Sequence, residues 1–185
     1  MNYNIIAFSG SLRKESYTTK LVKAFQQFAP QQMTVNYVEI GHLPFINQDL
    51  EANLPAAVLD LHETIAKADG VIFATPEYNR SYSPVLKNAI DWGSRPEGEN
   101  KWKRKPVAIV GCTPYNLGAF GAQNHLRQSM MYLDMVPLQQ PEFYLGKAAE
   151  KFDAAGKLTD ETSIKKIIEL WEAFAPLIAM HAEKK

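Results

Sequence analysis

Short apolar runs alternate with longer segments of helical periodicity along the whole chain. Runs typical of buried strands lie at residues 5–8, 33–40, 71–74 and 106–112, with a last one near 143–145. Apolar positions at helical spacing predict helices at about 16–28, 56–67, 84–93, 122–133 and 159–181. Short strands separated by helices are typical of parallel pairing through right-handed crossovers. The pattern therefore predicts an α/β protein with a doubly wound five-stranded parallel sheet, helices on both faces, and a single domain over residues 1–185.

Two polar, turn-rich stretches interrupt this pattern. Residues 41–54 are predicted to be a loop, and residues 96–104 a polar segment exposed at the surface. The lone Cys112 ends an apolar strand, so it is expected to be a small core residue, and an intramolecular disulfide is excluded.

Charge and hydropathy narrow the class of protein. Lys and Arg number 20 and Asp and Glu number 20, so no net field attracts nucleic acid or an anionic membrane. No apolar stretch approaches the roughly 20 residues of a membrane span. The apolar run at residues 5–8 is too short for the core of a signal peptide. We expect a cytoplasmic protein with neither a nucleic-acid nor a membrane partner.

Three polar junctions follow predicted strands, at residues 9–16, 75–83 and 113–121. Ligands of doubly wound folds bind beyond the carboxyl ends of the strands. We therefore expect the three junctions to meet in one site, to which the third contributes Thr113, Pro114 and Gly118.

The first junction has the composition of a phosphate cradle. It brings hydroxyl and guanidinium groups to a helix N-terminus, with the candidates Ser9, Ser11, Arg13, Ser16, Tyr17 and Thr18. Neither the dinucleotide pattern G-x-G-x-x-G nor the triphosphate pattern G-x-x-x-x-G-K-[ST] is present. A hydroxyl-rich cradle suits a single terminal phosphate, as on FMN. The alternative is a plain strand-to-helix turn in which Ser16 caps the helix.

The second junction has the composition of a ring-binding edge. Its candidates are Pro76, Glu77, Tyr78, Asn79, Arg80 and Ser81. Backbone N–H groups here are suited to the carbonyls and N5 edge of a flavin, where they would stabilise the added electron density. Tyr78 is either an aromatic face for the ring or a half-buried packing residue.

The motifs Ser-Gly-Ser-Leu-Arg-Lys at 9–14, Thr-Pro-Glu-Tyr-Asn at 75–79 and Leu-Lys-Asn-Ala-Ile-Asp-Trp at 86–92 resemble the NADPH-dependent FMN reductase family. That family includes bacterial quinone, chromate and azo-dye reductases. The resemblance runs from the first strand to about Gly146. It implies a flavodoxin-like fold, FMN phosphate held by Ser11, Arg13 and Ser16, a ring edged by residues 76–79, and a homodimer or homotetramer.

Two departures from the family concern the predicted site. Thr18 stands where the family has asparagine, and we expect a modest effect because a hydroxyl can serve there. Tyr-Ser-Pro at residues 82–84 replaces the family's Val-Pro-Gly. This change is expected to add the Tyr82 phenol beside the flavin and to alter the choice of acceptor.

Other chemistry-bearing residues have simpler interpretations. Lys87, Asn88 and Asp91 lie at helical spacing and are expected to pair and cap, although the resemblance allows Asp91 or Arg95 to reach a flavin across a dimer interface. The four histidines are scattered, so no metal site is expected.

The resemblance implies an oxidoreductase that passes electrons from NADPH or NADH through FMN to a small acceptor such as a quinone, an azo compound or chromate. A ping-pong cycle of this kind needs no catalytic side chain, because the flavin supplies the chemistry. A flavodoxin-like electron carrier is the first alternative, and the neutral charge argues against it. A reductase that releases FMN as product is the second, since the same contacts would serve. A phosphoacceptor domain is set aside, because Ser9 and Thr75 stand where it needs acidic residues.

Overall fold

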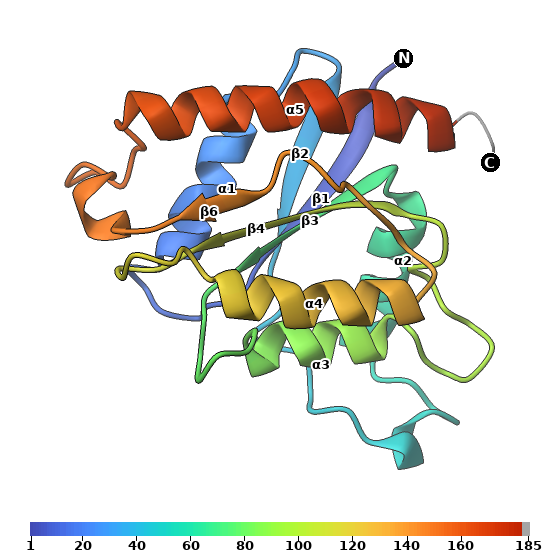
Figure 1. The fold of residues 1–185 in the computed structure, drawn as a ribbon. Coiled ribbons are helices and arrows are strands. Elements are labelled where there is room, and N and C mark those ends of the chain that lie inside the picture. The colour runs from blue at the N-terminus through green and yellow to red at the C-terminus, as the bar shows by residue number, and fades with distance from the viewer. Residues whose placement is uncertain (183–185) are drawn as a thin grey trace.

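A parallel sheet with helices on both of its faces forms the protein, and the computed structural model describes residues 1–182 (Figure 1). The strands are β1 (Tyr3–Ser9), β2 (Met33–Val38), β3 (Gly70–Thr75), β4 (Pro106–Cys112), β5 (Val136–Pro137) and β6 (Phe143–Leu145). The helices are α1 (Tyr17–Gln27), α2 (Ala56–Lys67), α3 (Pro84–Trp92), α4 (Phe120–Tyr132) and α5 (Glu161–Ala182), with short 3₁₀ turns η1 (Gln48–Leu50) and η2 (Ala148–Glu150).

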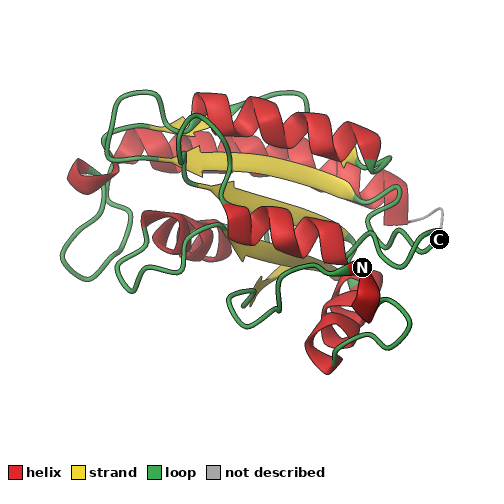
Figure 2. Cartoon of the chain, turned by 90° about the horizontal axis from the view of Figure 1, so that it is seen from below, coloured by secondary structure: helices red, strands yellow, loops and turns green. Residues whose placement is uncertain are grey.

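The strand order is β2-β1-β3-β4-β5, and β6 also pairs with β4. All pairs are parallel, as predicted. The order reverses between β1 and β3, which is the switch point where doubly wound folds bind ligands. The strand arrows point toward a group of loops at one end of the sheet (Figure 2).

The five predicted strand positions are confirmed, and two short strands share the last position beside β4. Val136 pairs with Pro106, and Phe143 pairs with Val110. Pro137 and Pro141 have no N–H to donate to a sheet ladder, which explains why the edge is interrupted between them. The strand near 143–145 was predicted, whereas β5 was not.

Alternate residues of β1 face opposite helical layers. Ile5 and Ala7 pack with α1 and α5, whereas Ile6 and Phe8 pack with α2, α3 and α4. Figure 1 shows α5 and α1 on one side of the sheet and α3 and α4 on the other. Both faces are therefore buried, as the near-continuous apolar runs of β1, β3 and β4 predict.

The segment at 96–104 is a loop that is mostly exposed or half-buried, as predicted, but Trp102 is an exception. Trp102 is fully buried, with its ring centroid 5.9 Å from that of Phe8 and 5.5 Å from that of Phe73. Its Nε1–H donates to the Ile90 carbonyl at 2.9 Å. The sequence did not predict this contact, because the neighbours of Trp102 in the chain are charged and its partners lie on distant elements.

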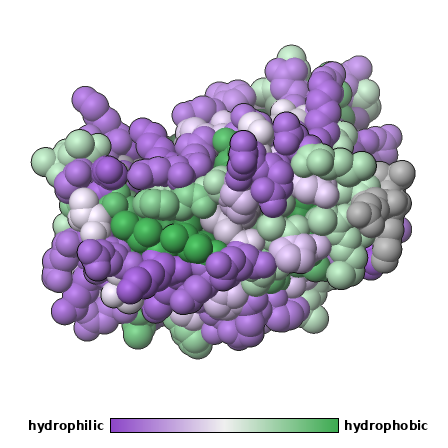
Figure 3. All heavy atoms as spheres, turned by 90° about the horizontal axis from the view of Figure 1, so that it is seen from above, coloured by the Kyte–Doolittle hydropathy of each residue, from purple (hydrophilic) through white to green (hydrophobic). Residues whose placement is uncertain are grey.

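The face that α5 covers is mostly hydrophilic, with a small apolar strip (Figure 3). The large apolar side chains of α5 that reach the surface are Ile168, 42% exposed, and Met180, 55% exposed. Among residues 1–182, no helix is both long enough and apolar enough to cross a bilayer.

Candidate flavin site

A pocket of about 750 Å³ lies at the carboxyl ends of the strands, and all three predicted junctions line it. The first contributes Ser11, Arg13, Ser16, Tyr17 and Thr18, and the second contributes Pro76, Glu77, Tyr78, Asn79 and Arg80. The third contributes Thr113, Pro114, Tyr115, Leu117 and Ala119, and Cys112 of β4 completes the wall. Ser9, Ser81 and Gly118 are outside this lining. Ser81 and Gly118 are next to lining residues in the sequence, and the Ser9 hydroxyl is hydrogen-bonded to Thr18.

A buried hydroxyl network anchors the first junction. The hydroxyls of Ser9 and Thr18 share a hydrogen bond of 2.7 Å, and those of Thr18 and Ser16 share one of 2.9 Å. Ser16 is also the N-cap of α1, because its Oγ accepts from the Thr19 N–H at 3.1 Å. The capping alternative is therefore confirmed for Ser16, which lines the pocket as well.

The remaining groups of this junction have the chemistry to bind an anion. The first turn of α1 holds no acidic residue, so its N-terminal partial positive charge is uncompensated by side chains of that turn. Ser11 is 8% exposed, and its Oγ accepts from the Arg13 N–H at 3.4 Å. Arg13 is exposed and lines the pocket. Hydroxyls, a guanidinium and a helix N-terminus together are the donor set that a phosphate monoester requires.

The second junction is a tight hairpin. The Tyr78 N–H donates to the Ser81 carbonyl at 2.9 Å, and the Ser81 N–H returns a bond of 3.0 Å to the Tyr78 carbonyl. Asn79 and Arg80 between them have φ of 50° and 67°, the left-handed pair of a type I′ turn. The N–H groups of Tyr78 and Ser81 are therefore engaged, and those of Asn79 and Arg80 are the candidates for a flavin edge. Tyr78 is 43% exposed, so its ring is accessible from the pocket.

The first two junctions touch directly. A Cβ at Gly10 would lie 2.7 Å from Pro76 Cδ and 2.7 Å from Ser83 Oγ, so only glycine fits between them. Ser83 caps α3, and Pro84 occupies its first turn. This packing holds the first junction and the hairpin of the second junction at a fixed separation.

The third junction supplies an apolar mouth that was not predicted. Tyr115 is 79% exposed and Leu117 is 57% exposed, and both line the pocket. Their only signal in the sequence was their place in a loop after a strand. Gly118 lets this loop pack closely against β6, because its φ is 57° and a Cβ there would lie 2.6 Å from the Leu145 backbone nitrogen.

Cys112 is a buried wall residue, 2% exposed. Burial raises the pKa of its thiol well above the ordinary value, so the reactive thiolate is disfavoured. The prediction that Cys112 is a core residue is confirmed.

Cys112 should therefore resist alkylation in the folded protein. We expect iodoacetamide at pH 8 to leave the native thiol unmodified over a period in which the urea-unfolded chain is fully labelled, as read by mass spectrometry. Equal labelling of both states would contradict the assigned burial.

Tyr82, which was predicted to stand beside the flavin, does not line this pocket. Its hydroxyl shares a 2.8 Å hydrogen bond with Ser129 of α4, and Tyr82 lines a second groove outside the pocket. The side chain follows the hairpin's exit toward α4, so the replacement at 82–84 acts on helix packing.

The second groove, of about 1450 Å³, lies along α3 and α4. Lys87 Nζ lies 2.6 Å from the Asp91 carboxylate, which confirms the predicted pair. Asn88 accepts from the Ile46 N–H at 2.8 Å, a structural link also consistent with the prediction. Arg95 Nε lies 3.6 Å from Glu51 Oε1, so its partner within the chain is a carboxylate of the 41–54 loop. Contact of Asp91 or Arg95 with a flavin of another subunit stays a prediction.

Metal ligation has no cluster to support it in the part of the chain that the structure describes, residues 1–182. No three His, Cys, Asp or Glu side chains there are grouped for an ion. Buried His62 has a structural partner instead, because its Nε2 lies 2.9 Å from the Trp92 carbonyl.

Comparison with known proteins bears on this pocket. The model of the NADPH-dependent FMN reductase family matches residues 3–150. The chain belongs to this family. As an FMN reductase family member it is an oxidoreductase, and its cofactors are FMN and NADPH or NADH. Every loop of the pocket lies within the matched range, so the resemblance of the motifs is confirmed.

Individual relatives of this FMN reductase family member span most of its length. A quinone reductase of Pseudomonas putida is 47% identical over 161 residues, which cover 86% of this chain and 87% of that protein. A 2-hydroxy-1,4-benzoquinone reductase of a Burkholderia species is 39% identical over 175 residues, covering 95% and 96%. The solved structure of a flavoenzyme NAD(P)H:(acceptor) oxidoreductase from Paracoccus denitrificans superposes with a TM-score of 0.91 at 40% identity, covering 97% and 98%. The flavodoxin-like fold is thereby confirmed.

Proposed function

We propose that this chain is an NAD(P)H-dependent quinone reductase in which the described pocket holds FMN. One observation carries the proposal. Three loops meet in one pocket that has hydrogen-bond donors suited to a phosphate at one end and apolar and aromatic side chains at the other. In this proposal residues 1–185 act as one FMN-binding domain, and no nucleic-acid or membrane partner is needed.

The residues present fit FMN. Ser11, Arg13 and the first turn of α1 offer donors to a phosphate, and the engaged hydroxyls of Ser16 and Thr18 hold that turn in place. A volume of about 750 Å³ lies within the usual range of small-molecule sites. Bound FMN supplies the redox chemistry, accepting a hydride and passing electrons on.

The protein's own groups bind and orient in this scheme. The Asn79 and Arg80 N–H groups sit on a rigid turn, which suits them to stabilise negative charge at a ring edge without reorganising. The packing of Gly10 against Pro76 holds the two loops together, so the groups that would bind the phosphate and the ring stay at a fixed distance from each other. No side chain needs to act as acid, base or nucleophile.

The pocket mouth favours a planar apolar acceptor. Tyr78, Tyr115 and Leu117 are all exposed there, so a quinone ring would bury apolar surface against them. A chromate ion would gain nothing from these contacts. Relatives named as quinone reductases support the same choice.

Steady-state oxidation of NADPH or NADH with a soluble benzoquinone tests this proposal. We expect catalytic turnover and parallel double-reciprocal lines, because the nicotinamide leaves before the acceptor binds. Bound flavin that gives no turnover with quinone would support the electron-carrier alternative. Flavin that is lost on desalting and is reduced as a free substrate would support the second alternative.

We also propose a homodimer or homotetramer in the cytoplasm. Exposed aromatic and apolar side chains beside the second groove support self-association, namely Phe45 (82% exposed), Met131 (74%) and Tyr132 (90%). A free thiol suits a reducing compartment. Sedimentation velocity should give at least twice the chain mass of 20.8 kDa.

A further inference from the structure

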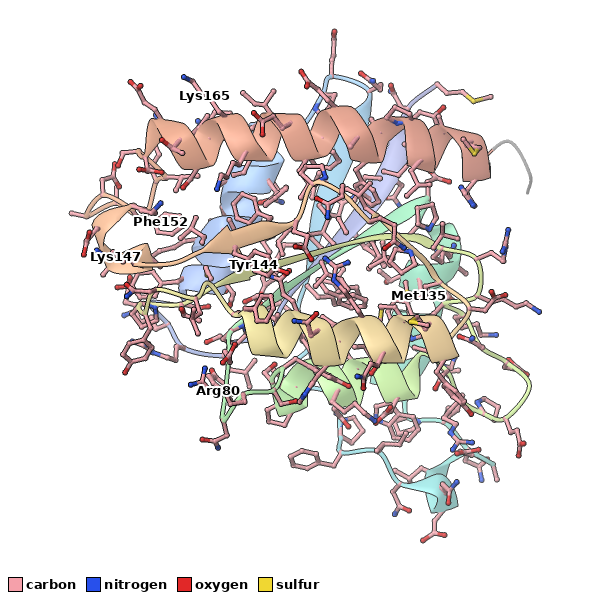
Figure 4. The ribbon with its side chains drawn as sticks, in the orientation of Figure 1. Arg80, Met135, Tyr144, Lys147, Phe152 and Lys165 are labelled. Atoms are coloured by element: carbon pink, nitrogen blue, oxygen red, sulfur yellow. The ribbon has the colours of Figure 1, made fainter. Side chains whose placement is uncertain are left out.

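The hairpin of the second junction, at residues 78–81, is hydrogen-bonded along one face of α4. Ser81 Oγ and His125 Nδ1 share a hydrogen bond of 3.2 Å, and Tyr82 and Ser129 share one of 2.8 Å. A third contact joins Glu77 to Gly121. Positions 121, 125 and 129 are four residues apart, so they lie above one another on the same face of the helix. Figure 4 shows Arg80 on the loop below the N-terminal end of α4.

Glu77 makes the strongest of these contacts. Its Oε2 accepts from the Gly121 N–H at 2.9 Å and from the Ala122 N–H at 3.3 Å. α4 has no cap of its own, because Ala119 at the N-cap position offers no side-chain hydrogen bond. A residue 44 positions earlier in the chain therefore satisfies orphan donors of this helix.

The contacts of Glu77 with Arg80 and with the first turn of α4 are together called the Glu77 clamp. This clamp is charged, largely shielded from solvent and closely packed. The Glu77 side chain is 11% exposed, and its Oε1 lies 3.2 Å from Arg80 Nη1. A Cβ at Gly121 would lie 3.1 Å from the Arg80 carbonyl oxygen, tighter than most real contacts. The carboxylate thus links the side chain of Arg80, a central residue of the turn, to the first turn of α4. Interaction with the helix dipole adds to its hydrogen bonds.

We propose that Glu77 is a positioning residue for flavin reduction, fixing the hairpin whose Asn79 and Arg80 N–H groups face the ring. This inference rests on the proposed function. Turn residues with left-handed φ are costly unless their surroundings impose them, and the contacts of Glu77 with Arg80 and α4 are among those that hold this turn. Loss of the clamp releases the donors from the ring edge, which lowers the hydride-transfer rate more than the affinity for NADPH.

Two variants test the role on protein saturated with FMN, by anaerobic stopped-flow reduction with NADPH. Glu77→Ala is expected to slow the limiting rate of flavin reduction roughly 10- to 100-fold, with the Kd for NADPH changed less than about threefold. Glu77→Gln keeps one acceptor oxygen but loses the charge, so its limiting rate should be intermediate. If Glu77→Ala does not fold or take up FMN, Glu77→Gln carries the test.

Asp160→Asn is the matched control. Asp160 also caps a helix with its carboxylate, accepting from the Ser163 N–H at 2.8 Å, and also pairs with a cation, Lys151 Nζ at 3.2 Å. It lies outside the pocket lining. Asparagine caps a helix about as well as aspartate, so Asp160→Asn should fold and should be reduced at a rate within about twofold of wild type.

The outcomes separate the two proposals. Wild-type protein that takes up no FMN would overturn the proposed function itself. Wild-type protein that binds FMN and is reduced, together with a Glu77→Gln or Glu77→Ala variant reduced at the same rate, would overturn only the positioning role and leave Glu77 as a helix cap.

Discussion

Replacing Arg13 with alanine is expected to weaken FMN binding by roughly 10- to 100-fold. The guanidinium is the charged donor that lines the phosphate end of the pocket, and a hydrogen bond to a charged group contributes about 1.5–3 kcal/mol. Titration of apoprotein with FMN, followed by quenching of flavin fluorescence, measures the change in Kd.

Two further variants make the Arg13 result specific. Lys14→Ala removes a neighbouring exposed cation that does not line the pocket, and it should leave the Kd within about twofold. Thr18→Ala should weaken binding less than Arg13→Ala, because its buried hydroxyl bonds to Ser9 and Ser16. Unchanged affinity of Arg13→Ala for FMN would contradict the assignment of the phosphate to this loop.

Replacing Gly118 with alanine is expected to lower the free energy of unfolding by about 2–4 kcal/mol. Its φ of 57° strains any residue with a Cβ, and that Cβ would lie 2.6 Å from the Leu145 nitrogen and 2.6 Å from the Tyr144 carbonyl carbon. Backbone cannot rotate away as a side chain can, so the loop or β6 must move. Urea unfolding followed by circular dichroism measures the loss.

Gly98→Ala is the control for this prediction. Gly98 also has a left-handed φ, 87°, but a Cβ there would meet no atom within 4 Å. The variant should therefore lose only the strain contribution, about 1 kcal/mol. Equal destabilisation by the two variants would mean that the close packing behind the third junction contributes nothing.

Most of the fold followed from local patterns. The helix predicted at 56–67 is α2 (Ala56–Lys67), and the strand predicted at 106–112 is β4 (Pro106–Cys112). Buried parallel strands and amphipathic helices repeat their apolar positions at fixed periods, so neighbouring residues carry the information. The three junctions were predictable for the same reason, because strand ends determine where they meet.

What the sequence did not predict depends on partners far apart along the chain. Trp102 lies in a polar stretch, yet it contacts Phe8 and Phe73. Tyr82 was expected beside the flavin, yet its hydroxyl meets Ser129, 47 residues on. Glu77 was predicted as a site residue, but its capping of α4 leaves no local pattern. Such contacts are fixed by how helices pack on the sheet.

The absorbance spectrum of FMN-reconstituted protein, recorded before and after anaerobic addition of NADPH, tests the central claim most directly. The account predicts that the protein retains flavin on desalting and that the flavin bands bleach when NADPH is added. Protein that takes up no FMN, or flavin that neither NADPH nor NADH reduces, would contradict it.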